Sequence, residues 1–347
     1  MKREINIWGS IPPPYGGVGM HILRLLNGLK KKKANVVLKN YMPQDDLKID
    51  YCFVVRELLK LPFIKTKILH FHMSSTLLCI VLLTFGFRHK IGITIHNQRS
   101  VLIKNRIIKY IFSKFYQRCD FIIMNDEAYS KKFAYFFNIR EIKKICIIQA
   151  FIPPTDEERT GVDESVRSFR DNFEFIISSC SYGLTRENGY DVYGVDMLIE
   201  LVHRLKLSNI DTGLLLCLSH IVDQYYYEQL KRRIKDYGID RNVFILNKEV
   251  PNGFEYWEIS DLFIRATKTD MEGISVKEAL SLGTNVIASN VCKRPSQCIL
   301  YQDGDIDDLY EKVCTLYLSG KYKEKINYES PQDVVEAVYN IYKELQT

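Results

Sequence analysis

The sequence predicts an α/β protein made of two doubly wound domains that face each other across a cleft. Three observations support this prediction. The chain of 347 residues is too long for one ordinary core. Short apolar, β-branched runs alternate with helical stretches along the chain, which is typical of parallel sheets covered on both faces. A polar segment interrupts the alternation near the middle, so two successive series of strands and helices predict two sheets.

The first domain is expected at residues 1–152. Its predicted strands are INIWGS (5–10), ANVVLKNYM (34–42), KILHFHMSS (67–75), KIGITIHN (90–97), CDFIIMND (119–126) and KICIIQAFI (144–152). Between the first two strands, an apolar stripe at helical spacing predicts a helix with Lys30 to Lys33 at its C-terminal end; the stripe consists of Val18, Ile22, Leu25, Leu26 and Leu29. The apolar run at 77–87 is shorter than the ~20 residues that span a bilayer, so a buried helix is expected there.

Residues 153–171 are polar, acidic and proline-led, and they predict a linker. The second domain is then expected at 172–329. Its predicted strands are FEFIISSCS (173–181), TGLLLCLSH (212–220), NVFILNKE (242–249), DLFIRAT (261–267), NVIASN (285–290) and QCILYQ (297–302). Residues 330–347 predict a closing helix with Ser330 as its N-cap, which must pack on one of the two domains.

Cysteine usage and charge restrict the setting of the protein. The nine cysteines are scattered without a C-x-x-C pair or zinc spacing, which favours reduced thiols and a cytoplasmic location. The first residues lack the apolar region of a signal peptide. Residues 1–150 carry 26 Lys and Arg against 9 Asp and Glu, whereas the rest carries 22 against 33. This asymmetry suggests that one half faces an anionic surface; no recognition motif supports nucleic acid, which leaves a membrane surface.

The stretch TDMEGISVKEALSLGT (269–284) places carboxylates at a turn between a predicted strand and helix. Ligands of open α/β sheets bind at such carboxyl ends. One interpretation of Glu278 is structural, because Ser275 to Glu278 fits a capping box with Gly283 ending the helix. Capping does not explain Asp270 and Glu272. Free amides at the helix start would favour a phosphate, and nearby carboxylates would accept sugar hydroxyls.

Two further turns are candidates. The loop GSIPPPYGGVGMHIL (9–23) matches neither a dinucleotide fingerprint nor a P-loop, but Gly16 and Gly17 allow close approach of a ligand; an ordinary tight turn is the alternative. His96 follows an apolar strand and suits either a structural or a functional role. His70 and His72 alternate along one strand, and we interpret both as core residues.

Two motifs remain. The D-x-D of Asp303 and Asp305 lies just before a helix, so N-capping is a better explanation than a metal. The helix predicted at 106–118 mixes basic and apolar residues, and it suits an anionic membrane surface as well as a core position with a basic edge. The absence of G-x-S-x-G, H-E-x-x-H and P-loop motifs argues against a hydrolase.

Taken together, the chain resembles the retaining glycosyltransferases of family 4, which have the GT-B fold of two Rossmann-like domains and include bacterial capsule and lipopolysaccharide enzymes. The most specific similarity is RATKTDMEGISVKEALSLGTNVIASN, where Asp270 and Glu278 have the family's acid-x7-acid spacing. The first acid is usually Glu, so Asp270 is a departure.

The resemblance implies a nucleotide-sugar donor as substrate, no metal and no other cofactor. It makes Glu278 the acceptor for ribose hydroxyls, and Asp270 and His96 the residues that contact the donor sugar. Phosphate and base would be held by residues matched to the family's motifs, namely Gly16, Gly17, Gly273, Ile274, Ser275, Val276, Asn247 and Glu249. It also implies front-face attack, in which the leaving phosphate deprotonates the acceptor.

A second departure concerns the diphosphate. The family places an Arg and a Lys in the loop after the first strand of the second domain, whereas Tyr193-Gly194 stands at the expected K-G here. We expect Arg186, the one cation nearby in the sequence, to substitute for both. The expected activity is transfer to a glycan or lipid-linked acceptor at the inner face of the cytoplasmic membrane. The alternatives are a catalytically silent homologue that acts as a partner subunit and, third, a sugar-nucleotide epimerase.

Overall fold

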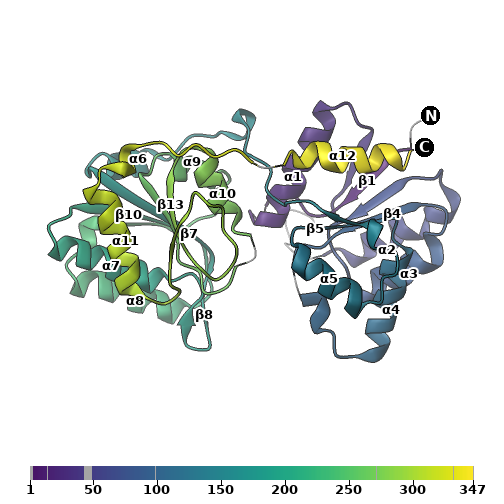
Figure 1. Ribbon diagram of the computed structural model, residues 1–347, viewed down its shortest axis with the longest axis horizontal. Coiled ribbons are helices and arrows are strands. Elements are labelled where there is room, and N and C mark those ends of the chain that lie inside the picture. Colours follow the sequence, from purple (N-terminus) through teal and green to yellow (C-terminus); the bar gives the residue numbers. More distant parts are fainter. Residues whose placement is uncertain are drawn as a thin grey trace. The chain divides into compact units, whose positions relative to one another are not determined.

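The computed structural model describes residues 3–13, 15–42, 49–97, 99–270, 272–330 and 332–346. The chain divides into two compact units (Figure 1). The first unit contains Met1–Ile152 and Pro331–Thr347, and the second contains Pro153–Ser330. Within the described residues, each unit is built on a six-stranded parallel sheet, which confirms the predicted α/β class.

The sheet of the first unit has the strand order β2-β1-β3-β4-β5-β6. Its strands are β1 (Ile5–Trp8), β2 (Val36–Lys39), β3 (Ile68–Phe71), β4 (Lys90–Thr94), β5 (Phe121–Met124) and β6 (Ile145–Ile147). They fall within the six predicted segments, and most of the residues that the prediction added are loops at the strand ends. From β1 the chain runs outward to β2 and then returns to the other side of β1, so the order reverses between β1 and β3.

Helices cover both faces of this sheet because its strands are apolar on both sides. One core contains Phe71, Ile93 and Met124 and is covered by α2 to α5; the other contains Ile7, Ile68 and Ile123 and is covered by α1 and α12. The helices are α1 (Gly17–Lys31), α2 (Tyr51–Leu59), α3 (Thr76–Phe85), α4 (Arg106–Arg118), α5 (Glu127–Phe136) and α12 (Val334–Glu344).

The closing helix therefore packs on the first unit. Figure 1 shows α12 beside α1, and a Cβ added at Gly28 of α1 would lie 2.7 Å from Val335, so glycine permits this close packing. The helix starts later than expected: Asp333, not Ser330, is its N-cap and accepts a hydrogen bond from the amide of Glu336.

The second sheet has the order β11-β10-β7-β12-β13-β14 and reverses between β7 and β12. Its strands are β7 (Phe175–Leu184), β10 (Thr212–Ile221), β11 (Val243–Leu246), β12 (Leu262–Arg265), β13 (Asn285–Ser289) and β14 (Ile299–Tyr301). An antiparallel hairpin that the sequence did not predict follows β7; it consists of β8 (Arg186–Glu187) and β9 (Tyr190–Asp191).

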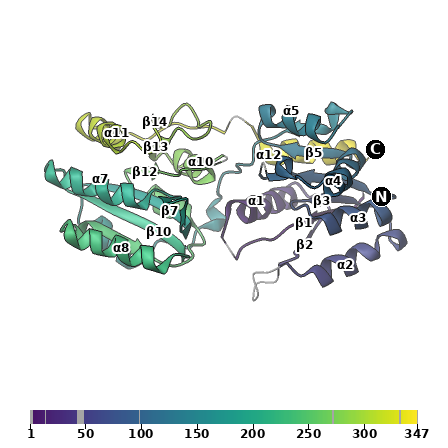
Figure 2. The same cartoon turned by 90° about the horizontal axis from the view of Figure 1, so that it is seen from below.

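Alternate side chains of the second sheet enter two cores. Leu216 and Ile264 face α7, α8 and α11, whereas Leu215 and Phe263 face α6, α9 and α10. Figure 2 shows α7 and α8 side by side. The helices are α6 (Glu164–Arg170), α7 (Val195–Leu207), α8 (Gln224–Asp236), α9 (Gly253–Glu258), α10 (Ile274–Ser281) and α11 (Ile306–Leu318). Short 3-10 turns are Leu61–Phe63, Arg99–Leu102, Ile142–Lys144, Asp156–Glu158, Asp240–Asn242 and Lys321–Lys323.

Three local expectations differ from the structure. The segment 153–171, expected as a linker, carries α6, and its Val166 is fully buried in the second unit. Val18 of the α1 stripe is exposed. The apolar helix α3 buries Leu78 and Leu82 but exposes Leu77, Ile80 and Leu83, so it is only half-buried. None of the helices in the described ranges is long and apolar enough to cross a bilayer.

Candidate functional site

The strand order reverses between β7 and β12, and this is the position where open α/β sheets form ligand sites. Cys180 of β7 and Arg265, the last residue of β12, lie here, and the Arg265 guanidinium reaches the Cys180 carbonyl at 3.4 Å. The turn after β12 leads into α10. The most specific stretch of the sequence therefore folds at the switch point of the second sheet.

Asp270 is held by two arginines. Its Oδ2 accepts hydrogen bonds from Arg265 Nε at 3.2 Å and from Arg294 Nη1 at 2.9 Å. The Arg294 side chain is fully buried, and those of Asp270 and Arg265 are only 11% and 14% exposed. Burial raises the pKa of Asp270, but the two guanidinium groups outweigh it and hold this pKa below its usual value. Asp270 is therefore the ionised centre of a triad.

The resemblance assigned Asp270 to sugar hydroxyls, yet the structure shows it engaged with these cations. Sequence analysis missed both arginines. A signal existed for Arg265, because a charged residue at the end of the apolar run LFI (262–264) is unusual in a buried strand. Arg294 gave no local signal, since it lies 24 residues from Asp270 and only the fold brings them together.

The start of α10 depends on Gly273. This residue is the N-cap and has φ +64°, a conformation that favours glycine. A Cβ at this position would lie 2.3 Å from Arg294 Nη1 and 3.1 Å from Asp270 Oδ2. The backbone therefore crosses directly over the buried ion pair, and glycine is required both for the conformation and for the space.

The capping-box interpretation of Glu278 is wrong. Since Gly273 is the N-cap, Ser275 lies inside the helix and cannot be its N-cap. Glu278 is buried, with an exposed fraction of 9%, and lies close enough to Cys180 to raise the pKa of that thiol, although burial is the larger cause. Gly283 ends the helix as predicted, with φ +86°. Helix capping thus leaves the position of Glu278 unexplained.

The backbone amides expected to hold phosphate are Gly273, Ile274, Ser275 and Val276. The amide of Val276 donates to the Gly273 carbonyl at 2.9 Å, so it serves the helix itself. The amides of Ile274 and Ser275 belong to the first turn, where the helix offers no carbonyl partner. Glu272 makes a local ion pair with Lys277 at 2.5 Å. Two of the four expected amides, those of Ile274 and Ser275, therefore lie in the first turn of α10, and their phosphate-binding role stays a prediction.

Arg186 lies elsewhere in the second unit. It is on the hairpin, donates to Asp223 Oδ2 from Nε at 3.2 Å and from Nη2 at 3.0 Å, and covers the Tyr226 ring. The expected substitution for the missing cations is not supported, because this side chain is committed to another contact. Tyr193 instead lies beside Arg265, whose guanidinium carbon is 5.5 Å from the ring centroid.

Asn247 and Glu249 follow β11, the edge strand of the second sheet. Asn247 is exposed, and Glu249 Oε1 lies 2.9 Å from His220 Nε2. The hydrogen bonds that join Asp270 to Arg265 and Arg294 therefore involve neither Asn247 nor Glu249. A pocket of about 410 Å3 lies beside the hairpin; Tyr190, Lys268 and Asp303 are among its lining residues.

The remaining candidates belong to the first unit. Gly16 is the N-cap of α1, and Gly17 is its first residue. His96 follows β4 and is half-buried. His72 Nδ1 lies 2.9 Å from His96 Nε2, so these two imidazoles share a hydrogen bond. His70 fits its predicted core role, since Tyr342 and Thr94 contact its two ring nitrogens.

In the part of the chain that the structure describes, three histidines lie close enough together to hold a metal ion. His21, His72 and His96 place one nitrogen each within 4.8 Å of one another. The D-x-D motif has other roles: Asp305 caps α11, and Asp303 lies 3.2 Å from Lys268. The expectation that the D-x-D motif caps a helix is thus confirmed for Asp305.

Residues 187–333 match the family model "Glycosyl transferases group 1", a span that covers most of the second unit and contains Arg265, Asp270, Glu278 and Arg294. No curated protein matches the sequence. The second unit is therefore similar to group 1 glycosyl transferases over residues 187–333.

Solved structures share the whole fold. Anabaena Alr3699/HepE, solved in complex with UDP, has a TM-score of 0.64 at 12% identity and covers 98% of this chain and 95% of its own. A glycosyltransferase from Rickettsia africae has a TM-score of 0.62 at 15% identity, covering 98% and 94%. An alpha,alpha-trehalose-phosphate synthase (UDP-forming) from Burkholderia vietnamiensis has a TM-score of 0.64 at 11% identity, covering 99% and 96%. The fold is therefore the GT-B fold.

Proposed function

We propose that this protein is a glycosyltransferase that moves a sugar from a nucleotide-sugar donor, with retention, to a glycan or lipid-linked glycan precursor of a surface polysaccharide. The observation that carries the proposal is the polar site at the switch point of the second sheet, where Glu278, Arg265 and the start of α10 converge within the segment that matches the glycosyl transferase family.

The start of α10 suits the diphosphate of a donor. A helix N-terminus carries a partial positive charge, and the first-turn amides of Ile274 and Ser275 are aligned for an anion. Arg265 adds a full charge and a planar set of donors that matches phosphate oxygens. In this proposal Arg265 supplies the cation that the chain lacks at Tyr193, and Asp270 and Arg294 fix its orientation.

Glu278 suits the ribose. A carboxylate accepts hydrogen bonds and does not donate them when it is ionised, so it recognises a pair of hydroxyl groups. Its position on α10 places it one turn beyond the phosphate-binding amides, on the same short helix. Because Glu278 is nearly buried, a ligand that lacks one of these hydroxyl groups would deprive the carboxylate of a hydrogen bond, and this loss would weaken binding of the wrong ligand.

The proposed reaction needs no protein nucleophile. In front-face attack the leaving phosphate takes the acceptor proton, and the main demand on the protein is to stabilise charge on the diphosphate as the glycosidic bond breaks. Oriented amides and Arg265 meet that demand. No metal is proposed for this step. The roles expected for His96, Gly16, Gly17, Asn247 and Glu249 stay predictions.

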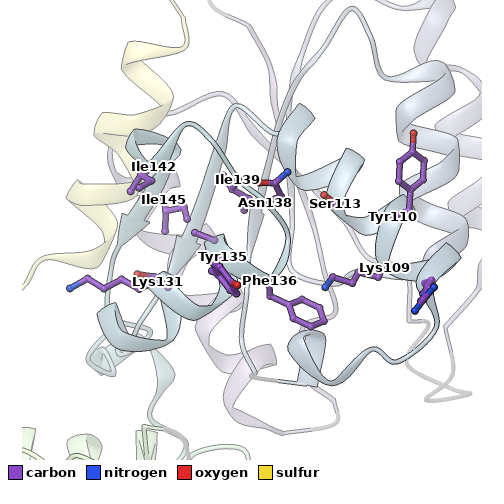
Figure 3. Close-up of a pocket in the computed structure, with 13 residues that line it drawn as sticks. Lys109, Tyr110, Ser113, Lys131, Tyr135, Phe136, Asn138, Ile139, Ile142 and Ile145 are labelled. Atoms are coloured by element: carbon purple, nitrogen blue, oxygen red, sulfur yellow. The ribbon is translucent and has the colours of Figure 1, made fainter.

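We propose that the first unit, which would bind the acceptor, lies on a membrane surface. A groove of about 870 Å3 lies between α4 and α5 of the first unit (Figure 3). Exposed apolar side chains line it, and Tyr110, Tyr135 and Ile142 are 62%, 90% and 69% exposed. Among the described residues that line the groove, three are basic and none is acidic. Figure 3 shows Lys109 near the Phe136 ring, with Nζ 3.8 Å from its centroid.

Apolar and basic side chains on one face favour the headgroup region of an anionic bilayer, at about 1 kcal/mol for each basic residue near the surface. We therefore propose a peripheral protein at the inner face of the cytoplasmic membrane, where a lipid-linked acceptor would be available.

The test is a thermal-shift assay with UDP, GDP and ADP on wild-type protein, Glu278→Gln and the control Glu311→Gln, which changes an exposed residue of α11. UDP is tried first because two of the structural relatives are described with UDP. A ligand at a hundred times its Kd stabilises by about 2.7 kcal/mol. We expect a shift with one nucleotide series that Glu278→Gln abolishes and Glu311→Gln retains.

A second arm tests the diphosphate assignment. Arg265→Met should lose the preference for a nucleoside diphosphate over the monophosphate while retaining weak monophosphate binding. The engagement of Arg186 with Asp223 favours the rival hypothesis of a catalytically silent subunit. Failure of every nucleotide to shift a cooperatively melting wild-type protein would overturn our proposal and favour that rival.

A further inference from the structure

The first unit has its own switch point, between β1 and β3, and three histidines meet there. His21 lies on α1, the helix that follows β1; His72 follows β3; His96 follows β4. The topology therefore brings three imidazoles from separate segments to one end of the sheet. We propose that His21, His72 and His96 form a binding site for a divalent transition-metal ion of the zinc type.

Ring spacing supports this site. The ring centroids are 5.5 Å apart for His21 and His72, 5.3 Å for His21 and His96, and 5.2 Å for His72 and His96. A Zn–N distance of about 2.0–2.1 Å places each imidazole centroid about 3 Å from the metal, so three tetrahedrally arranged ligands have centroids about 5 Å apart. The observed triangle is nearly equilateral and close to that size.

The ligand nitrogens are also near their required positions. They lie within 4.8 Å of one another, whereas tetrahedral zinc ligands are separated by about 3.3 Å. A side-chain movement of about 1.5 Å at the widest pair would bring these nitrogens to the separation found around zinc. The His72 Nδ1 to His96 Nε2 distance of 2.9 Å is already short, and a cation would take the place of the proton in this hydrogen bond.

The contact of His21 with the backbone favours ligation. His21 Nδ1 lies 2.6 Å from the carbonyl oxygen of Ala150, which only accepts, so Nδ1 carries the proton and Nε2 is the nitrogen that can coordinate a metal. His72 would coordinate through Nδ1, the nitrogen that faces His96. His70 is excluded as a ligand because Tyr342 and Thr94 occupy both of its nitrogens.

The exposure of the three rings fits as well. His21 and His72 are buried, whereas His96 is half-buried, so the fourth coordination position would lie on the solvent side. Three histidines with one open position are typical of zinc that binds an exchangeable ligand.

Cobalt(II) is the probe, because it takes zinc sites and absorbs visible light when it is tetrahedral. We expect wild-type protein, titrated with CoCl2 at pH 7.5 without nucleotide, to bind one ion per chain with visible absorption bands, and Zn2+ to displace them. His21→Ala and His96→Ala should weaken binding by at least tenfold. The control His203→Ala, which removes a histidine stacked on Tyr237 in the second unit, should not change it.

Circular dichroism of each variant checks that the fold is retained, and His96→Ala carries the test if substitution of the more buried His21 prevents folding. The proposal is overturned if folded wild-type protein shows no tetrahedral cobalt bands, or if both variants bind as tightly as wild type. Because the assay contains no nucleotide, its outcome is independent of the nucleotide thermal shift.

Discussion

Arg294 donates a hydrogen bond from Nη1 to Oδ2 of Asp270 across 2.9 Å, and the arginine side chain of this pair has no exposed surface. The pair connects the segment after β13 to the turn before α10, and Arg265 joins it from the end of β12. A buried guanidinium is stable only with a fixed carboxylate partner. The helix start that we assign to phosphate therefore rests on an ionic triad.

Removal of Arg294 should destabilise the second unit strongly. Arg294→Met leaves a buried carboxylate with one partner fewer, and breaking a buried pair costs about 3–5 kcal/mol. We expect about 3 kcal/mol, because Arg265 remains. Urea unfolding followed by Trp257 fluorescence, in a Trp8→Phe background, reports the second unit alone.

The matched control is Arg241→Met. Arg241 pairs with Asp211 at 3.0 Å, but these side chains are 75% and 56% exposed, so the loss should be no more than about 1 kcal/mol. Equal losses in the two variants would show that the buried triad has no special role in stability.

The triad should also give the stability a defined dependence on pH. Asp270 has a lowered folded-state pKa, so its contribution is present above the unfolded value of about 3.9 and is lost as pH falls through the folded value. Asp270→Asn should therefore be less stable than wild type by a constant amount from pH 7 to 5. Below about pH 4 this difference should narrow, as measured by urea midpoints. A difference that widens with acid would mean that burial, not the arginines, controls this pKa.

Gly273→Ala should be more damaging than an alanine at another glycine with positive φ. The conformational cost of the left-handed region is about 1–2 kcal/mol. At Gly273 the added Cβ would also lie 2.3 Å from Arg294, whereas at Gly161, with φ +88°, it would meet nothing within 4 Å. We expect Gly161→Ala to show the conformational cost alone. Gly273→Ala should show a larger loss of stability and lose the nucleotide thermal shift. Equal effects would contradict the proposed packing.

Binding to anionic vesicles should depend on the groove between α4 and α5. Arg106 is exposed at the start of α4, where a cation opposes the helix dipole, so Arg106→Ala should not harm the fold. The variant should lose about 1 kcal/mol of binding free energy, which weakens vesicle binding about fivefold. Added salt should reduce this difference between wild type and Arg106→Ala. Co-sedimentation with phosphatidylglycerol vesicles measures it. Arg232→Ala, an exposed change on α8, is the control, and an equal loss there would contradict a specific face.

Much of the fold was predictable because strand signals are local. A run such as KIGITIHN contains its own evidence: apolar, β-branched residues that continue on both faces of the chain. All twelve strands of the two large sheets lie at predicted segments. The end of α10 at Gly283 was equally local, because glycine alone readily adopts its φ of +86°.

What the sequence by itself determined, then, was the alternation of strands and helices and the turn that carries Asp270 and Glu278. Only the tertiary structure decided the partners of those residues, because ion pairs form between segments that are distant in the chain. It paired Asp270 with Arg294, engaged Arg186 with Asp223, and gathered His21, His72 and His96. Side-chain packing and charge balance across the end of a sheet depend on strand order, which no single segment of the sequence encodes.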